Sequence, residues 1–270
     1  MGTSQSSSGP GKGVPLVPPW AEGVVPDDAD SDDATTGVSE QDQDGPAPLA
    51  PRARFRSARR ALGGFAQSGD DRSLRRSLSH YVRTGYGGAG TMTRRMGGTT
   101  KTAGRLYGVL ESGRAPDGTD LRDAVLATGN DINAILDAIA DAASPLDGTQ
   151  DAESSRTAVR DALSALLEEY PDIDVFALTD EQRLFVIERY IALDIFNRFC
   201  LDLQTTIVEK SPDLVTGLRR VNQVQEFIVE HVAAAFRDLR EYGSSVTSSK
   251  IAQLAHDALR TTFSVFEDYT

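Results

Sequence analysis

"TDEQRLFVIERYIALDIFNRFCLDLQTTIV", residues 179–208, is the stretch that decides the fold. Thr179 and Gln182 stand three residues apart at its start, which is the spacing of a capping box at a helix N-terminus. The run that follows is apolar on most faces of a helix, and helices with this pattern are buried in the interior of a protein. The sequence therefore predicts a long central helix with other helices packed around it.

The segments before this central stretch carry apolar side chains at helical spacing. "NDINAILDAIADAA" begins with Asn130 and Asp131, either of which can cap a helix. "SSRTAVRDALSALLEEYP" continues the same pattern and stops at Pro171, which cannot continue a helix. Both segments are expected to pack an apolar face on the central helix.

Two more helices are predicted after the central stretch. "SPD" at 211–213 sets Ser211 as an N-cap and Pro212 as the first helical residue, and this helix can run to about Gly243. A last helix is expected from about Thr247 to Asp268. Few runs alternate apolar and polar residues as a strand does. The predicted fold class is therefore all-α, a helical bundle formed by residues 107–270.

The charge of the chain changes sign twice along its length. Residues 1–50 carry nine acidic side chains and one lysine, residues 51–106 carry thirteen basic and two acidic side chains, and residues 107–270 carry 29 acidic and 14 basic ones. The stretch 22–50 is acidic and bounded by prolines, with too little apolar surface to order itself. We therefore predict a disordered acidic tail (1–50), a basic segment (51–106) and an all-helical domain (107–270).

The basic segment is predicted to be only partly helical. "RARFRSARRALGGFAQSG" (52–69) and "DDRSLRRSLSHYVRTG" (70–85) each show a helical apolar stripe, and Asp70 or Asp71 can cap the second helix. "GYGGAGTMTRRMGG" (85–98) contains too many glycines for a regular element. We expect a loop there.

A search for catalytic or metal-binding chemistry finds no site. The three histidines, His80, His231 and His256, are far apart in the sequence and have no second ligand at metal spacing. "GPGKG" at 9–13 lacks the spacing, the hydroxyl residue and the preceding strand of a phosphate-binding loop. Cys200 lies in an apolar run typical of a buried, inert thiol. We therefore predict a protein that is not an enzyme and holds no cofactor and no metal.

The arginines of the basic segment have two interpretations that the sequence leaves open. They can grip the phosphates of a nucleic acid, or they can meet an acidic partner or the protein's own acidic regions. No known nucleic-acid-binding motif frames them, so the second interpretation is favoured. The candidate contact residues are Arg52, Arg54, Arg56, Arg59, Arg60, Arg75 and Arg76.

Neither a membrane nor export is indicated. No stretch approaches the ~20 apolar residues that a membrane span needs, and the start has no apolar segment of a secretory signal. Gly2 and Ser6 match the N-myristoylation pattern, but anionic lipid would repel the acidic stretch that separates them from the basic segment. We expect no membrane partner and a cytoplasmic location, in which the single cysteine stays reduced.

The opening "MGTSQSSSGPGKGVPLVPPWA", residues 1–21, resembles the start of QatB proteins. The shared features are Met-Gly-Thr-Ser at 1–4, Gly-Pro-Gly at 9–11 and Pro-Leu-Val-Pro-x-Trp at 15–20, whereas the helical body is similar only in general character. QatB proteins belong to four-component bacterial anti-phage systems with an ATPase, a QueC-like enzyme and a TatD-like nuclease. QueC-like enzymes activate a 7-deazaguanine carboxylate with ATP and couple it to an amine. The resemblance implies that this chain is a substrate and partner of the QueC-like component.

The chemistry of the opening fits that role. Removal of Met1 would expose the α-amine of Gly2, whose pKa of ~7.7–8.0 leaves far more neutral amine at pH 7 than a lysine has. The prolines favour an extended polyproline II segment that docks at little entropic cost. We expect the partner to contact Thr3, Ser4, Gly9, Pro10, Gly11, Pro15, Leu16, Val17, Pro18 and Trp20. The alternative is that Trp20 packs on the protein's own core.

Overall fold

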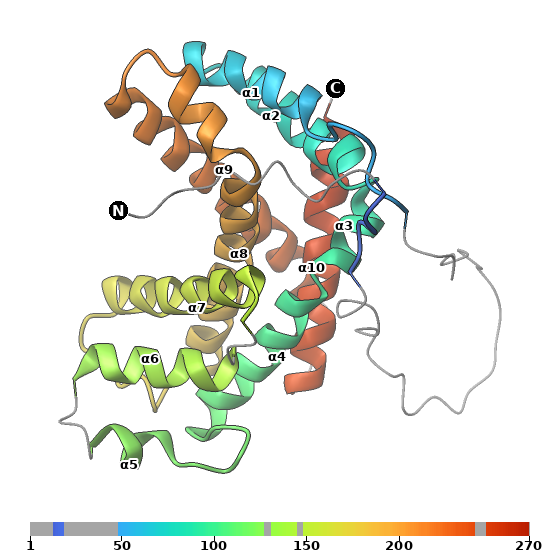
Figure 1. Ribbon diagram of the computed structural model, residues 1–270. Helices are drawn as coiled ribbons and strands as arrows, with labels where there is room; N and C mark the ends of the chain where they lie inside the picture. Colours follow the sequence, from blue (N-terminus) through green and yellow to red (C-terminus); the bar gives the residue numbers. More distant parts are fainter. Residues whose placement is uncertain (1–12, 19–47, 127–130, 145–147, 241–246, 270) are drawn as a thin grey trace, which may run out of the picture.

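The computed structural model describes residues 13–18, 48–126, 131–144, 148–240 and 247–269, and all regular structure in these ranges is helical (Figure 1). This confirms the predicted all-α class. The elements are α1 (Arg56–Ser68), α2 (Asp71–His80), the π-helical turn η1 (Tyr81–Gly85), α3 (Ala89–Arg95), α4 (Gly97–Ser112), α5 (Leu121–Leu126), α6 (Ile132–Ala143), α7 (Gln150–Glu169), α8 (Asp180–Lys210), α9 (Leu214–Arg240) and α10 (Ser248–Asp268).

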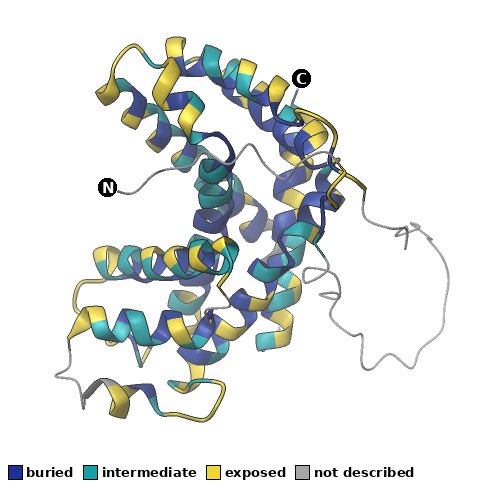
Figure 2. Cartoon of the chain, viewed as in Figure 1, coloured by how far each residue is buried: buried dark blue, intermediate teal, exposed yellow. Residues whose placement is uncertain are grey.

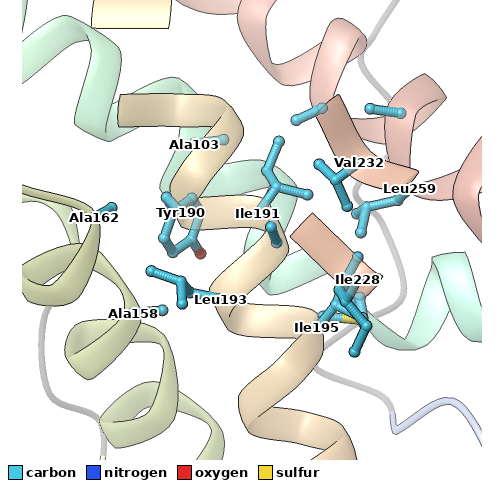
Figure 3. Close-up of a cluster of buried hydrophobic side chains, with 14 of the residues drawn as sticks. Ala103, Ala158, Ala162, Tyr190, Ile191, Leu193, Ile195, Ile228, Val232 and Leu259 are labelled. Atoms are coloured by element: carbon cyan, nitrogen blue, oxygen red, sulfur yellow. The ribbon is translucent and has the colours of Figure 1, made fainter. Parts of the chain in front are cut away.

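Helix α8 is the centre of the fold, as its apolar pattern predicts. Its N-terminus carries the capping box, with the Thr179 side chain accepting from the Gln182 N–H and the Gln182 side chain accepting from the Thr179 N–H. Helices α1, α4, α7, α9 and α10 all pack against it. Tyr190 lies on the side of α8 nearest α7, and Ile195 lies on the side of α9 (Figure 3). Both side chains are buried.

The flanking helices begin close to the predicted positions, with one exception. Asp131 caps α6, as predicted, and Thr247, near which the last helix was expected to begin, caps α10. Ser211, predicted as the N-cap of α9, instead ends α8, and α9 begins at Leu214. The Asp213 carboxylate accepts the Thr216 N–H at 2.8 Å. The first N–H groups of a helix have no partner within the helix, and a carboxylate accepts hydrogen bonds from them as a hydroxyl does. Asp213 therefore caps α9.

The basic segment belongs to the same core as the rest of the bundle. Phe55, Leu62 and Tyr81 lie in one continuous cluster of buried residues with Tyr190 and Phe263. The predicted boundary between residues 106 and 107 falls inside α4. Buried residues follow the inward faces of these helices, and exposed residues follow their outer faces (Figure 2). The sign of the charge therefore changes along the chain within one folding unit, because both segments contribute side chains to the same buried core.

The glycine-rich stretch 85–98, predicted as a loop, forms α3 and the start of α4. Gly87 and Gly88 take positive φ angles of 77° and 105°, which turns the chain into α3. Further along α4, a Cβ on Gly104 would lie 3.0 Å from the Ser248 carbonyl oxygen of α10. Close helix packing thus offsets the poor helix propensity of these glycines.

Candidate functional site

Residues 13–17 form a short antiparallel pairing with residues 48–50, which we call the N-terminal clasp. The Leu16 N–H donates to the Pro48 carbonyl at 2.9 Å, and the Ala50 N–H donates to the Val14 carbonyl at 2.8 Å. The Gly13 N–H donates to the Ala50 carbonyl at 3.2 Å. The clasp fixes one point of the N-terminal region against the helical body.

Two apolar side chains hold the clasp in place. Leu16 is 3 % exposed and Val17 is 1 % exposed. A Cβ on Gly87 would lie 3.2 Å from Leu16 Cδ1, so Leu16 packs directly over the glycine turn before α3. These two side chains, predicted to anchor on a partner, are thus buried on this chain, and their contact with a partner stays a prediction. The sequence shows their apolar character but not that residues 48–50 supply the pairing backbone.

The other residues of the predicted recognition segment are divided between described and undescribed positions. Pro15 is exposed and pairs with Leu49, and Pro18 ends the first described range. The remaining predicted contact residues and the modification site lie outside the described residues. They are Gly2, Thr3, Ser4, Gly9, Pro10, Gly11 and Trp20.

The predicted arginine patch separates into surface and interior members. Arg52, Arg56 and Arg60 are exposed at intervals of four residues, along and just before α1. Arg56 and Arg60 lie on the same face of α1 because residues four apart share a helix face, and Arg52 lies in the turn before the helix. On α2, Arg75 and Arg76 are also exposed. Five of the seven candidates therefore remain available at the surface.

Arg54 and Arg59, by contrast, point inward. The Arg54 guanidinium carbon lies 4.4 Å from the Phe55 ring centroid and 4.7 Å from that of Tyr86, and Arg54 is 8 % exposed. Arg59 donates to the backbone oxygen of Asp202 on α8 at 3.3 Å. Arg54 is therefore buried against aromatic rings and Arg59 is half-buried against α8, so a contact of these two with a nucleic acid or an acidic partner stays a prediction.

A buried tyrosine–carboxylate cluster joins the basic segment to α8. The hydroxyls of Tyr81 and Tyr86 donate to Asp202 Oδ2 at 2.9 Å and 2.6 Å. Burial raises the pKa of both tyrosines well above their ordinary value, and the neighbouring Asp202 carboxylate raises it further. Both hydroxyls therefore stay protonated as donors. The sequence does not reveal this cluster, because Asp202 is more than a hundred residues away from both tyrosines.

A cavity of about 230 Å³, which the sequence also does not reveal, lies between α3, α4, α7 and α8. Arg95 and Arg198 both bind the Asp151 carboxylate at its wall. Thr99 Oγ1 donates to Asp194 Oδ2 at 2.5 Å. Burial raises the pKa of Asp194 to about 6. Charged and hydroxyl side chains from four separate helices thus converge on one hollow.

The structure gives further information on metal binding, the thiol and the membrane. Within the described ranges, no three His, Cys, Asp or Glu side chains are placed to hold a metal ion. Burial raises the pKa of the Cys200 thiol to about 12, which agrees with the predicted inert thiol. Among the helices that the structure describes, none has the length and apolar character needed to cross a bilayer.

Comparison with known proteins finds one family. A family model described as QatB, Qat anti-phage system associated protein QatB, matches residues 87–266. No curated protein and no solved structure matches the chain. The matched region runs from the glycine turn before α3 to the end of α10 and does not include the opening motif in residues 1–21.

Proposed function

The chain belongs to the QatB family of Qat anti-phage system associated proteins, and from this premise we propose that it is a non-enzymatic component that presents its N-terminus to a QueC-like partner. The partner would attach a 7-deazaguanine-type group to the α-amine of Gly2 in an ATP-dependent reaction. Such a protein would act in the cytoplasm with the other components of the system, the ATPase and the TatD-like nuclease. Its own role would be that of substrate and docking partner.

The N-terminal clasp is the observation that carries this proposal furthest. It fixes Gly13 to Ala50 and buries Leu16 and Val17 on the helical body. Gly13 lies eleven positions after Gly2, and a fully extended chain of eleven steps spans at most ~36–40 Å. The clasp thus sets the maximum distance from Gly13 that the α-amine can reach. A catalytic site of the partner would have to lie within that distance when the two proteins are docked.

The chemistry asks little of this chain beyond a neutral, accessible amine. Once Met1 is removed, the nitrogen lone pair of Gly2 would form an amide bond with the activated carboxyl carbon. The activating group would leave with one carboxylate oxygen, and the amine would release a proton to solvent. Gly2 suits this step because it has no side chain to obstruct the approach. ATP and the activated carboxylate would both be held by the partner.

The test is the mass of the N-terminal peptide of the full chain, produced with and without the QueC-like partner. A mass increase confined to this peptide is expected only with the partner present. A Gly2→Leu variant should retain Met1 and show no increase, while Gly2→Ala, which also allows Met1 removal, serves as the matched control. An unmodified N-terminal peptide in the wild-type chain produced with the partner would rule the proposal out.

A second candidate function, binding of a nucleic acid, is supported by the surface arginines. Arg52, Arg56 and Arg60 form no ion pair with any residue of the described ranges, so their charges are available to phosphates. Salt-sensitive binding to random DNA that is lost in a triple Arg→Glu variant of these positions would favour this function. A chain that binds no DNA at low salt would leave these three arginines as a contact for an acidic protein partner.

A further inference from the structure

The cavity between α3, α4, α7 and α8 is surrounded by more positive than negative charge. Arg95, Lys101, Arg105 and Arg198 line it, against Asp151 and Asp194. The four basic side chains therefore exceed the two carboxylates by two positive charges, even when both carboxylates are ionised. Such an excess in a hollow that is partly shielded from water attracts anions more strongly than the same charges on an open surface.

The ion pairs at the wall of the cavity leave two cations unused. Asp151 is shared between Arg95, at 2.6 Å, and Arg198. Lys101 and Arg105 lie one helical turn apart on α4 and form no ion pair within the described part of the chain. Both are exposed. They line the cavity from α4 and can reach a ligand that enters it.

Neutral hydrogen-bonding groups complete the lining. Thr99, Thr102, Ser154 and Ser155 contribute hydroxyls, and the first turn of α7 adds the positive end of a helix dipole. The Ser155 hydroxyl is held at 2.7 Å from the Tyr190 hydroxyl. Fixed hydroxyls beside lysine and arginine are the usual partners of a phosphate group in proteins.

We propose that this cavity binds a small phosphate-bearing anion, either inorganic phosphate or a short phosphate ester. The volume of about 230 Å³ lies below the range typical of drug-sized ligands. A long polymer or a large cofactor would not fit inside it. Lys101 and Arg105 would hold the phosphate oxygens from α4, and the Arg95–Asp151–Arg198 arrangement would form the rigid floor of the site.

The test is isothermal titration calorimetry of the full chain with inorganic phosphate, ribose 5-phosphate and AMP in separate titrations. One-site, saturable binding is expected for at least one of them. A Lys101→Gln, Arg105→Gln double variant should bind at least tenfold more weakly. The matched control, Arg219→Gln with Arg237→Gln, removes two exposed positive charges away from the cavity and should bind as the wild type does. The melting temperatures of both variants verify that the fold is intact.

The outcomes separate the sources of the phosphate group. Binding of inorganic phosphate alone identifies a free anion, whereas tighter binding of ribose 5-phosphate or AMP identifies an ester and shows that the cavity contacts the rest of the ligand. The absence of saturable binding by all three probes would overturn the proposal. Equal weakening in the cavity variant and in the control would overturn it as well, because it would show only general attraction of anions by the surface charge.

Discussion

Truncation of Leu16 should open the N-terminal clasp and leave the helical body folded. The side chain is 3 % exposed, and Leu16→Ala removes three of its carbon groups. At ~0.8 kcal/mol for each buried carbon, the clasp loses about 2–2.5 kcal/mol of stability. Leu16 is not part of the main buried cluster, so this loss should appear as local opening and not as global unfolding.

Hydrogen–deuterium exchange followed by mass spectrometry or NMR measures this opening directly. The Leu16 and Ala50 amides donate across the clasp, and their exchange should accelerate by roughly 50-fold in Leu16→Ala. The amide of Ile191, inside α8, should exchange as slowly as in the wild type. Leu218→Ala is the matched control because it shortens a leucine that is 53 % exposed, and it should change none of these amides.

Two results would refute the reasoning. Unchanged exchange at Leu16 and Ala50 in Leu16→Ala would show that burial of this side chain does not hold the clasp closed. Accelerated exchange at Ile191 to the same degree would show that the clasp and the helical body open together.

Three further predictions concern the buried polar groups and the helix packing. The pKa of Asp194 is about 6 in the fold against an ordinary 3.8, so its contribution to stability is complete below about pH 4 and is lost as the pH rises to 6. Asp194→Asn should therefore reduce the fall in unfolding free energy between pH 4 and pH 7 by about 2 kcal/mol in urea titrations; an identical pH dependence in both proteins would contradict this. Tyr86→Phe removes a buried donor to Asp202 and should lower the unfolding free energy by about 1–3 kcal/mol, whereas Tyr170→Phe, at an exposed site, should leave it within ~0.5 kcal/mol; equal effects would speak against the buried hydrogen bond. Gly104→Val places a branched side chain against the first carbonyl of α10 and should cost about 1–3 kcal/mol, read as a lower melting temperature, and an unchanged temperature would mean that the two helices separate freely.

The sequence predicts those parts of the fold that are set by neighbouring residues. The capping box of Thr179 and the cap at Thr247 depend on residues three positions away, and both are where the pattern places them. Ser211 and Asp213 are equally suitable caps, so the pattern alone does not choose between them. The distinction depends on where α8 ends, which packing determines.

The sequence does not predict what distant segments build together. The sequence suggests that Leu16 anchors on a partner, because its apolar character is visible in the sequence and its backbone pairing with residues 48–50 is not. The sequence suggests that Arg54 is a surface cation. Its position over the Tyr86 ring depends on how α1 meets η1, which the local sequence does not determine. The cavity has the same origin, since Arg95, Asp151 and Arg198 come from three helices and no local motif links them.

The clasp also has a consequence for how the chain tolerates change. The Leu16 N–H donates to the Pro48 carbonyl, so the two ends of the 31-residue segment between them are held together. The entropic cost of closing such a loop rises by only ~0.6 kcal/mol for each doubling of its length. Changes in the length or sequence of this segment, including the insertion of a reporter domain, should therefore leave the position of the clasp at Gly13 unchanged.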